Sequence, residues 1–99
     1  MPKFRKKPVE IEAVLYSGKV SKMGWPHEVT DAHPWLDAAY DDGILDNIRD
    51  STGDYITIKT LEGVMRANPG EWIIRGVKGE LYPCKPDIFA ATYDAVKPA

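Results

Sequence analysis

The sequence is poor in the residues that make covalent or metal cross-links. It has one cysteine, Cys84, and two histidines among 99 residues. A single chain can therefore form no internal disulfide and no cluster of thiolate metal ligands. Because such a chain suits a reducing compartment, we expect a cytoplasmic protein without disulfides, metals or cofactors.

Long apolar runs are also missing. Apolar stretches such as residues 13–16 are far shorter than the roughly 20 residues that span a bilayer. The basic start of the chain is followed by alternating polar and apolar residues, whereas an export signal has an apolar core at that place. We therefore expect no membrane partner and no export.

The chain does contain enough apolar material for one core. Hydrophobic residues make up 43% of it and include three Trp, five Tyr and two Phe. A length of 99 residues suits one domain, so we predict a single domain over residues 1–99. The formal net charge is only -2, but acidic residues gather in residues 28–54 and basic ones in residues 3–7. This distribution predicts one negative face.

The first half of the chain predicts one strand and one helix. In residues 8–16, apolar odd-numbered positions alternate with Glu10, Glu12, Val14 and Tyr16, the period of a half-buried strand. Residues 17–30 have the glycine and proline content of a loop.

A helix is predicted over residues 31–43, with Pro34 at its first turn and Gly43 as its C-terminal cap. Its apolar face carries Trp35, Leu36, Ala39 and Tyr40. Residues 44–48 fit either a continued helix or a short strand.

The second half predicts short strands separated by turns. Residues 68–71 read as a β-turn, with Pro69 and Gly70 in its two central positions. The predicted strands are residues 55–60, 64–67, 72–75, 80–82 and 92–96, with one helical turn at 86–90. Residues 55–60 are expected to pair with residues 64–67 through a turn at residues 61–63. The fold class that follows is α+β, a small antiparallel sheet of about five strands with one short helix packed on a face.

Four aspartates recur at every fourth position, namely Asp42, Asp46, Asp50 and Asp54. They would form one stripe on a helix, and a divalent metal site is one interpretation. Gly43 and the Ser-Thr-Gly segment at residues 51–53 interrupt such a helix, so a solvated acidic surface is favoured. An acidic face also suggests a DNA-mimic inhibitor, although such proteins are usually far more acidic.

The reactive residues do not form a recognisable catalytic set. His27 and His33 each lie beside a proline, where a capping or surface role is favoured over metal binding. Lys85 beside Cys84 would lower the pKa of the thiol, but a nucleophile also needs a base. The favoured interpretation is a packed residue at a strand end. An enzyme would need a cleft in which Cys84 or a histidine meets a carboxylate.

Aromatic and basic side chains offer a different possibility. Aromatic rings can stack on a nucleobase while arginines meet its phosphate. The candidate ligand-binding residues are Trp25, Arg66, Trp72, Arg75 and Tyr82, and Arg5 and Lys7 are further candidates for contact with the phosphate.

Two stretches carry a resemblance to known proteins, FRKKPVEIEA in residues 4–13 and NPGEWIIRGVKGELYPCKPDIF in residues 68–89. With them, the chain resembles a family of small proteins of uncharacterised function encoded by tailed bacteriophages and prophages, notably those of actinobacteria. The resemblance implies expression in the bacterial cytoplasm and a non-structural accessory role. It assigns no residue a function.

Together these observations favour a protein that acts by binding rather than by catalysis. The expected partner is a host or phage protein, or a second copy of the chain in a homo-oligomer, whereas direct nucleic-acid binding is not expected. The alternatives are a protein that binds or sequesters a small, nucleotide-like ligand and the DNA-mimic inhibitor.

Overall fold

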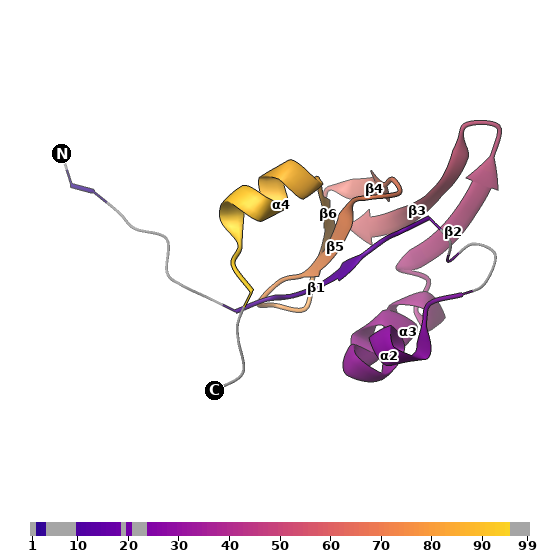
Figure 1. The fold of residues 1–99 in the computed structure, drawn as a ribbon, viewed down its shortest axis with the longest axis horizontal. Coiled ribbons are helices and arrows are strands. Elements are labelled where there is room, and N and C mark those ends of the chain that lie inside the picture. Colours follow the sequence, from indigo (N-terminus) through magenta and orange to yellow (C-terminus); the bar gives the residue numbers. More distant parts are fainter. Residues whose placement is uncertain (1, 4–9, 19, 21–23, 96–99) are drawn as a thin grey trace.

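The chain folds into two antiparallel three-stranded sheets with short helices around them (Figure 1). The computed structural model describes residues 2–3, 10–18, 20 and 24–95. In chain order the elements are β1 (Glu12–Leu15), α2 (His27–Ala32), α3 (Pro34–Asp41), β2 (Leu45–Asp50), β3 (Gly53–Thr60), β4 (Gly63–Ala67), β5 (Trp72–Arg75), β6 (Leu81–Cys84) and α4 (Pro86–Thr92).

The first sheet has the order β1-β5-β6. Val14 of β1 lies opposite Ile73 of β5, which in turn lies opposite Pro83 of β6. Because directly opposed residues share a face, these three side chains lie on one side of the sheet and their chain neighbours on the other.

The turn that leads into β5 follows the predicted chemistry. The N–H of Glu71 donates to the carbonyl of Asn68 at 3.0 Å, and Gly70 has a φ of +90°. Glycine takes this conformation without the steric cost that a side chain would add. The predicted β-turn at residues 68–71 and the strand Trp72–Arg75 are both confirmed.

The second sheet has the order β2-β3-β4. Ile56 lies opposite Asn47 on one side and Ala67 on the other, while Thr60 and Gly63 close the hairpin between β3 and β4. This hairpin was predicted from the sequence. The segment that fitted either a helix or a strand forms a strand, β2.

One hydrophobic core lies between the two sheets and beneath α3. Tyr16, Leu36, Ile56, Ile58 and Ile73 are all fully buried in it, and they come from both sheets and from the helix. Full burial of one such side chain contributes about 1.5–3 kcal/mol. The core therefore fixes the sheets against each other, with β6 beside β3 and β4.

The predicted helix over residues 31–43 is confirmed in part: α3 begins only at Pro34, because residues 31–32 belong to α2 and His33 separates the two helices. Pro34 occupies its first turn, and Gly43 follows its end with a φ of +74°. Leu36 and Ala39 are buried in the core, and Trp35 and Tyr40 pack against it. The predicted apolar face is therefore the one that packs.

The helix α4 covers the other face of the first sheet. Trp72 stacks on Phe89 with ring centroids 4.2 Å apart and planes 8° from parallel. The hydroxyl of Tyr82 lies 3.4 Å from that of Tyr93 just beyond the helix. Ile74, on the same face, is fully buried.

Several predictions about the elements are wrong. The described residues form two sheets with six strands in all, where one sheet of about five strands was expected, although the α+β class with antiparallel pairing is confirmed. In and directly after β1 the buried residues are Val14 and Tyr16, whereas Leu15 is 49% exposed. The period of two was right, but the face toward the core is the even-numbered one, because Val14 is opposite Ile73.

Two helical segments differ as well. Part of the predicted loop at residues 17–30 belongs to α2, which begins at His27. The predicted last strand at 92–96 is absent as far as Ala95, because α4 runs on to Thr92 and the N–H of Tyr93 donates to the carbonyl of Phe89. Val96, and residues 8 and 9 of the first predicted strand, lie outside the described residues.

Among the described residues, no helix has the length and apolar character needed to cross a bilayer.

Candidate functional site: a groove between two hairpins

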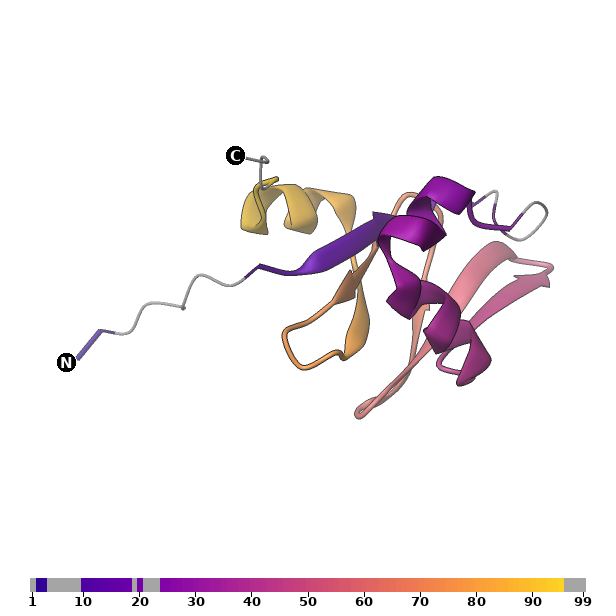
Figure 2. The ribbon, with the colours of Figure 1, turned by 90° about the horizontal axis from the view of Figure 1, so that it is seen from below.

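One candidate site is an open groove of about 820 Å³ between two hairpin turns, which we call the hairpin groove. Residues 59–62 and Met65 of the β3–β4 hairpin form one wall, and residues 78–82 of the β5–β6 hairpin form the other. Ile44 also lines it. Figure 2 shows both turns along the lower side of the molecule.

Short hydrogen bonds hold each turn in place. In the β3–β4 turn, Thr60 Oγ1 donates to the carbonyl of Gly63 at 2.7 Å and accepts from the N–H of Glu62 at 3.2 Å. Gly63 has a φ of +117°. These local bonds fix the backbone of this wall through the hydroxyl of Thr60, and they leave the side chains of Leu61 and Glu62 free of the turn.

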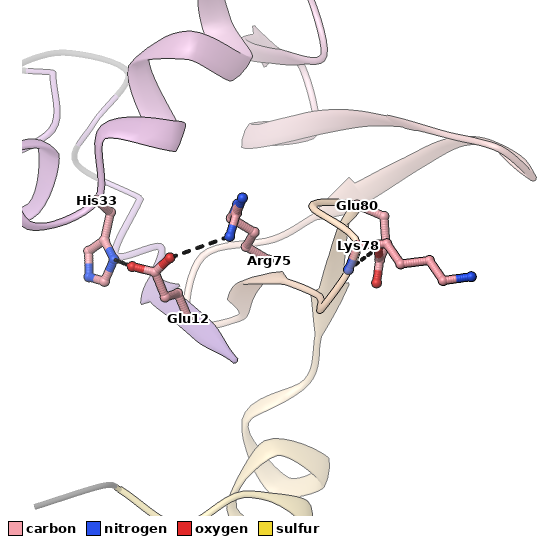
Figure 3. Close-up of polar contacts among 5 residues, drawn as sticks. All are labelled: Glu12, His33, Arg75, Lys78 and Glu80. Atoms are coloured by element: carbon pink, nitrogen blue, oxygen red, sulfur yellow. Dashed lines mark hydrogen bonds and ion pairs between the residues drawn. The ribbon is translucent and has the colours of Figure 1, made fainter. Parts of the chain in front are cut away.

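The β5–β6 turn is held in the same way. The N–H of Gly76 donates to the carbonyl of Glu80 at 2.8 Å, and the N–H of Lys78 donates to Glu80 Oε2 at 3.1 Å (Figure 3). The side chain of Glu80 packs so closely on Gly76 that a Cβ there would overlap it. The second wall is therefore also fixed by its own residues.

Apolar side chains are unusually exposed at the first wall. Leu61 is fully exposed and Met65 is 41% exposed, and both line the groove, whereas Val64, which is 66% exposed, lies on the outer face of the sheet opposite Lys59. Single exposed apolar residues are ordinary, whereas a cluster at the mouth of a groove is typical of a binding surface.

Charged side chains surround these apolar residues. Lys59, Glu62, Lys78 and Glu80 all line the hairpin groove, two of each sign. The ion pairs within the described residues join other groups, Glu12 with His33 and Arg75, and Arg49 with Asp54. The charges of Glu62 and Lys78 are therefore available to a partner in the groove, whereas the side chain of Lys59 lies on the outer face of its sheet and Glu80 accepts a hydrogen bond from its own turn.

A second cluster of interest joins three elements (Figure 3). His33 Nδ1 lies 3.0 Å from Glu12 Oε1, and Arg75 Nη1 lies 3.7 Å from Glu12 Oε2. His33 ends α2 and precedes α3, so its position is the predicted capping position, but its side chain bonds to Glu12 rather than to a helix end. The cluster ties the helices to the first sheet.

This cluster meets one condition of the enzyme hypothesis, a histidine within hydrogen-bond reach of a carboxylate. A pocket of about 340 Å³ beside it is lined by Glu12 and Arg75 but not by His33. Cys84 lies opposite Trp72, on the other face of the sheet from Glu12. The thiol and the histidine are therefore kept apart, and the described residues bring no nucleophile to this pair.

The Cys84 thiol itself is not activated. Burial, helped by the charges of Asp87 and Glu71, raises the pKa of Cys84. This direction is opposite to the lowering that Lys85 was expected to cause. The position of Cys84 at the end of β6 fits the favoured interpretation, a packed residue at a strand end.

The four regularly spaced aspartates do not form a stripe. Asp42 ends α3, Asp46 and Asp50 lie in β2, and Asp54 lies in β3. Asp50 accepts hydrogen bonds from Thr52 and Tyr55, which lower the pKa of its carboxyl. Within the part of the chain that the structure describes, no three His, Cys, Asp or Glu side chains are grouped to hold a metal ion.

The five residues predicted to bind a ligand are spread over the molecule. Trp72 and Tyr82 share the face under α4, and Tyr82 also lines the hairpin groove. Arg75 is on the opposite face of that sheet, paired with Glu12. Neither pocket described above is lined by more than one of the five.

The remaining two are engaged elsewhere. The indole N–H of Trp25 donates to the hydroxyl of Tyr40 at 2.9 Å. The guanidinium of Arg66 lies 3.7 Å from the centre of the Tyr55 ring, on the outer face of the second sheet. The ligand-binding role of these residues stays a prediction, and Arg5 and Lys7, other candidates for phosphate contact, lie outside the described residues.

Sequence reasoning missed the residues that form the hairpin groove, above all Leu61. The available signal was a leucine placed inside a predicted turn, where polar residues are usual. Comparison with protein-family models, with curated proteins and with solved structures finds no match for this chain.

Proposed function

We propose that this chain is a phage or prophage accessory protein that acts by binding another protein at the hairpin groove. The observation that carries the proposal is the fully exposed Leu61 beside the partly exposed Met65 at the mouth of the groove. These side chains add little to the stability of their own fold, and a partner that covered them would remove their apolar surface from water.

The wider arrangement supports binding over catalysis. Both walls of the groove are rigid turns, which reduces the entropy lost when a partner docks. The resemblance of residues 68–89 to phage and prophage proteins favours a host or phage protein as partner, in the cytoplasm of a bacterial host.

A small, nucleotide-like ligand is the second candidate. The groove volume of about 820 Å³ lies within the range of about 300–1,000 Å³ typical of small-molecule sites. Lys78 would meet a phosphate, and Tyr82 is one of the residues predicted to stack on a base. DNA mimicry has less support, because Asp46 and Asp50 share the outer face of their sheet with Lys59 and Arg66.

Site-specific photo-crosslinking in an actinobacterial host tests protein binding. A photoreactive residue replaces Glu62 at the groove or, as a matched control, Asp37 on the exposed side of α3. We expect covalent adducts to protein at position 62 and none above background at position 37, as detected by electrophoresis and mass spectrometry.

The absence of a specific adduct at position 62 would contradict protein binding. A thermal-shift screen with nucleotides then tests the second candidate, since a ligand at 100 times its Kd stabilises the fold by about 2.7 kcal/mol. A shift that Lys78→Ala abolishes would favour the small-ligand function.

A further inference from the structure

We infer that the free edge of β1 pairs with β1 of a second copy of this chain, in a two-fold symmetric dimer. In the first sheet, β1 and β6 are the two outer strands, and it is β6 that lines the hairpin groove. The dimer therefore uses a different surface and does not depend on the proposed function.

One edge of β1 has backbone groups without partners. Within the described residues the strand pairs only with β5. The N–H of Tyr16, directly after β1, donates to the carbonyl of Glu71 at 2.9 Å, so the even-numbered residues bond toward β5. Because the bonding direction alternates along an antiparallel strand, Ala13 and Leu15 direct their N–H and C=O groups outward. No hydrogen bond between described residues uses these outward groups.

The side chains on the outer face of this edge are apolar. Ala13 lies opposite Ile74 and Leu15 lies opposite Trp72, so β1 continues the apolar face that α4 covers. The cover is incomplete, because Leu15 is 49% exposed. Ile11, directly before the strand, is half-buried and falls on the same face by the period of two. Edge strands of monomers usually carry a lysine or a proline that blocks pairing, and this segment has neither.

The one charged residue of β1 does not oppose a second copy. Glu12 Oε1 lies 3.0 Å from His33 Nδ1, and Glu12 Oε2 lies 3.7 Å from Arg75 Nη1 (Figure 3). The carboxylate is therefore already met by a cation of its own chain. A charged partner strand would find no unpaired charge on β1, whereas a second β1 brings only the same neutralised carboxylate and apolar residues.

Two-fold symmetry gives the pairing a definite register. With Ala13 of the two copies opposite each other on the axis, Leu15 of each copy lies opposite Ile11 of the partner subunit. This register uses every outward backbone group from position 11 to position 15 and joins the two first sheets into one sheet of six strands. Glu12 then lies opposite Val14 of the partner subunit, so the two carboxylates are not directly opposed.

The first test measures the mass of the full chain by sedimentation equilibrium across a range of concentrations. We expect a reversible species of twice the 11.1 kDa chain mass. Leu15→Lys puts a charge into the paired edge and should raise the dimer Kd by at least about 30-fold, the size of a hot-spot loss. The matched change Val64→Lys, at an exposed apolar position of a strand in the second sheet, should leave the Kd within about twofold. Circular dichroism of each variant confirms that the fold is intact.

The second test locates the two-fold axis with a disulfide between copies. Directly opposed residues of a hydrogen-bonded antiparallel pair have Cα atoms about 5.5 Å apart, a separation that a disulfide spans. In a Cys84→Ser background, Ala13→Cys should therefore give a disulfide-linked dimer on mild oxidation with diamide, as seen by non-reducing electrophoresis. Leu15→Cys is the matched control, because the two copies of position 15 are about 13 Å apart along the strands and should not link.

Specific results would overturn the dimer. A full chain that stays monomeric at high concentration, or a dimer that Leu15→Lys does not weaken, excludes pairing at this edge. Linkage of Leu15→Cys as fast as that of Ala13→Cys excludes the register and with it the symmetric pairing. If the purified chain is monomeric while position 62 crosslinks to a different protein, the dimer is wrong and the proposed function still holds.

Discussion

The two sheets differ in what lies on their second faces. The first sheet packs Ile73 into the core on one side and stacks Trp72 on Phe89 of α4 on the other. The second sheet buries Ile56 and Ile58 on one side, but its outer face carries exposed or half-buried side chains such as Arg66 and Tyr55. The first sheet is therefore covered on both faces, whereas the second sheet is covered on one face only.

The uncovered outer face of the second sheet is nevertheless mostly polar, and its side chains are held by contacts with one another. The hydroxyl of Tyr55 donates to Asp50 at 2.8 Å, and Arg66 lies over the Tyr55 ring while donating to Asn68 at 2.7 Å. The most exposed apolar side chains of this sheet lie at one end, Leu61 in the β3–β4 turn and Val64 beside it on the outer face. The exposure of Leu61 is therefore a local feature of the hairpin tip and does not follow from the lack of a covering helix.

The largest expected effect contrasts two apolar residues of the same hairpin. Ile58→Ala should lower the free energy of unfolding by about 2–5 kcal/mol, because Ile58 is fully buried and its loss leaves a cavity. Leu61→Ala should change it by less than about 0.5 kcal/mol, because its side chain is already in water. Urea unfolding, performed at a protein concentration where the chain is monomeric, measures both. A loss above about 1.5 kcal/mol for Leu61→Ala would show that the tip packs within its own chain.

A smaller effect tests the cover that α4 gives the first sheet. Phe89→Ala should cost about 2–3 kcal/mol, because it removes the ring that stacks on Trp72 from a half-buried position. The neighbouring Ile88→Ala, which removes an exposed side chain, should stay within about 0.5 kcal/mol. Urea unfolding followed by Trp fluorescence measures both changes. Equal effects of the two substitutions would mean that α4 does not contribute to the core.

The same contrast explains which elements were predictable from sequence. The hairpin of β3 and β4 and the strand Trp72–Arg75 were found because glycine turns bound them on both sides. The helix α2 was missed because it buries none of its residues, so no apolar period marks it. The segment after Thr92 was predicted as a strand from its residue types, but the ring contact of Tyr93 with Phe89 decides its conformation.

The candidate site was harder to predict than the fold. The groove arises from two turns that are far apart in the sequence and belong to different sheets, and their separation is set by packing of the core. Local patterns carry no information on such a distance. These patterns favoured aromatic residues as ligand contacts, whereas in the structure Trp72 stacks on Phe89 and Trp25 donates a hydrogen bond to Tyr40.

The smallest expected effect uses Cys84 as a probe of the face under α4. Burial and the nearby Asp87 and Glu71 raise the pKa of its thiol, so less thiolate forms near neutral pH. The rate of alkylation by iodoacetamide should therefore rise with pH to a midpoint above about 8.5, the ordinary value of a free cysteine. Lys85→Ala should not change this midpoint, because burial rather than the lysine sets it.

Removing part of the cover that α4 gives this face of the first sheet should lower the raised pKa of Cys84. In Phe89→Ala the cover over Trp72, which lies opposite Cys84, is thinned, so the alkylation midpoint should move down toward that of the chain unfolded in urea. A midpoint at or below about 8.5 in the unchanged protein would contradict the raised pKa. A midpoint that stays high in Phe89→Ala would place the cause in the two carboxylates instead of in the helix that covers this sheet.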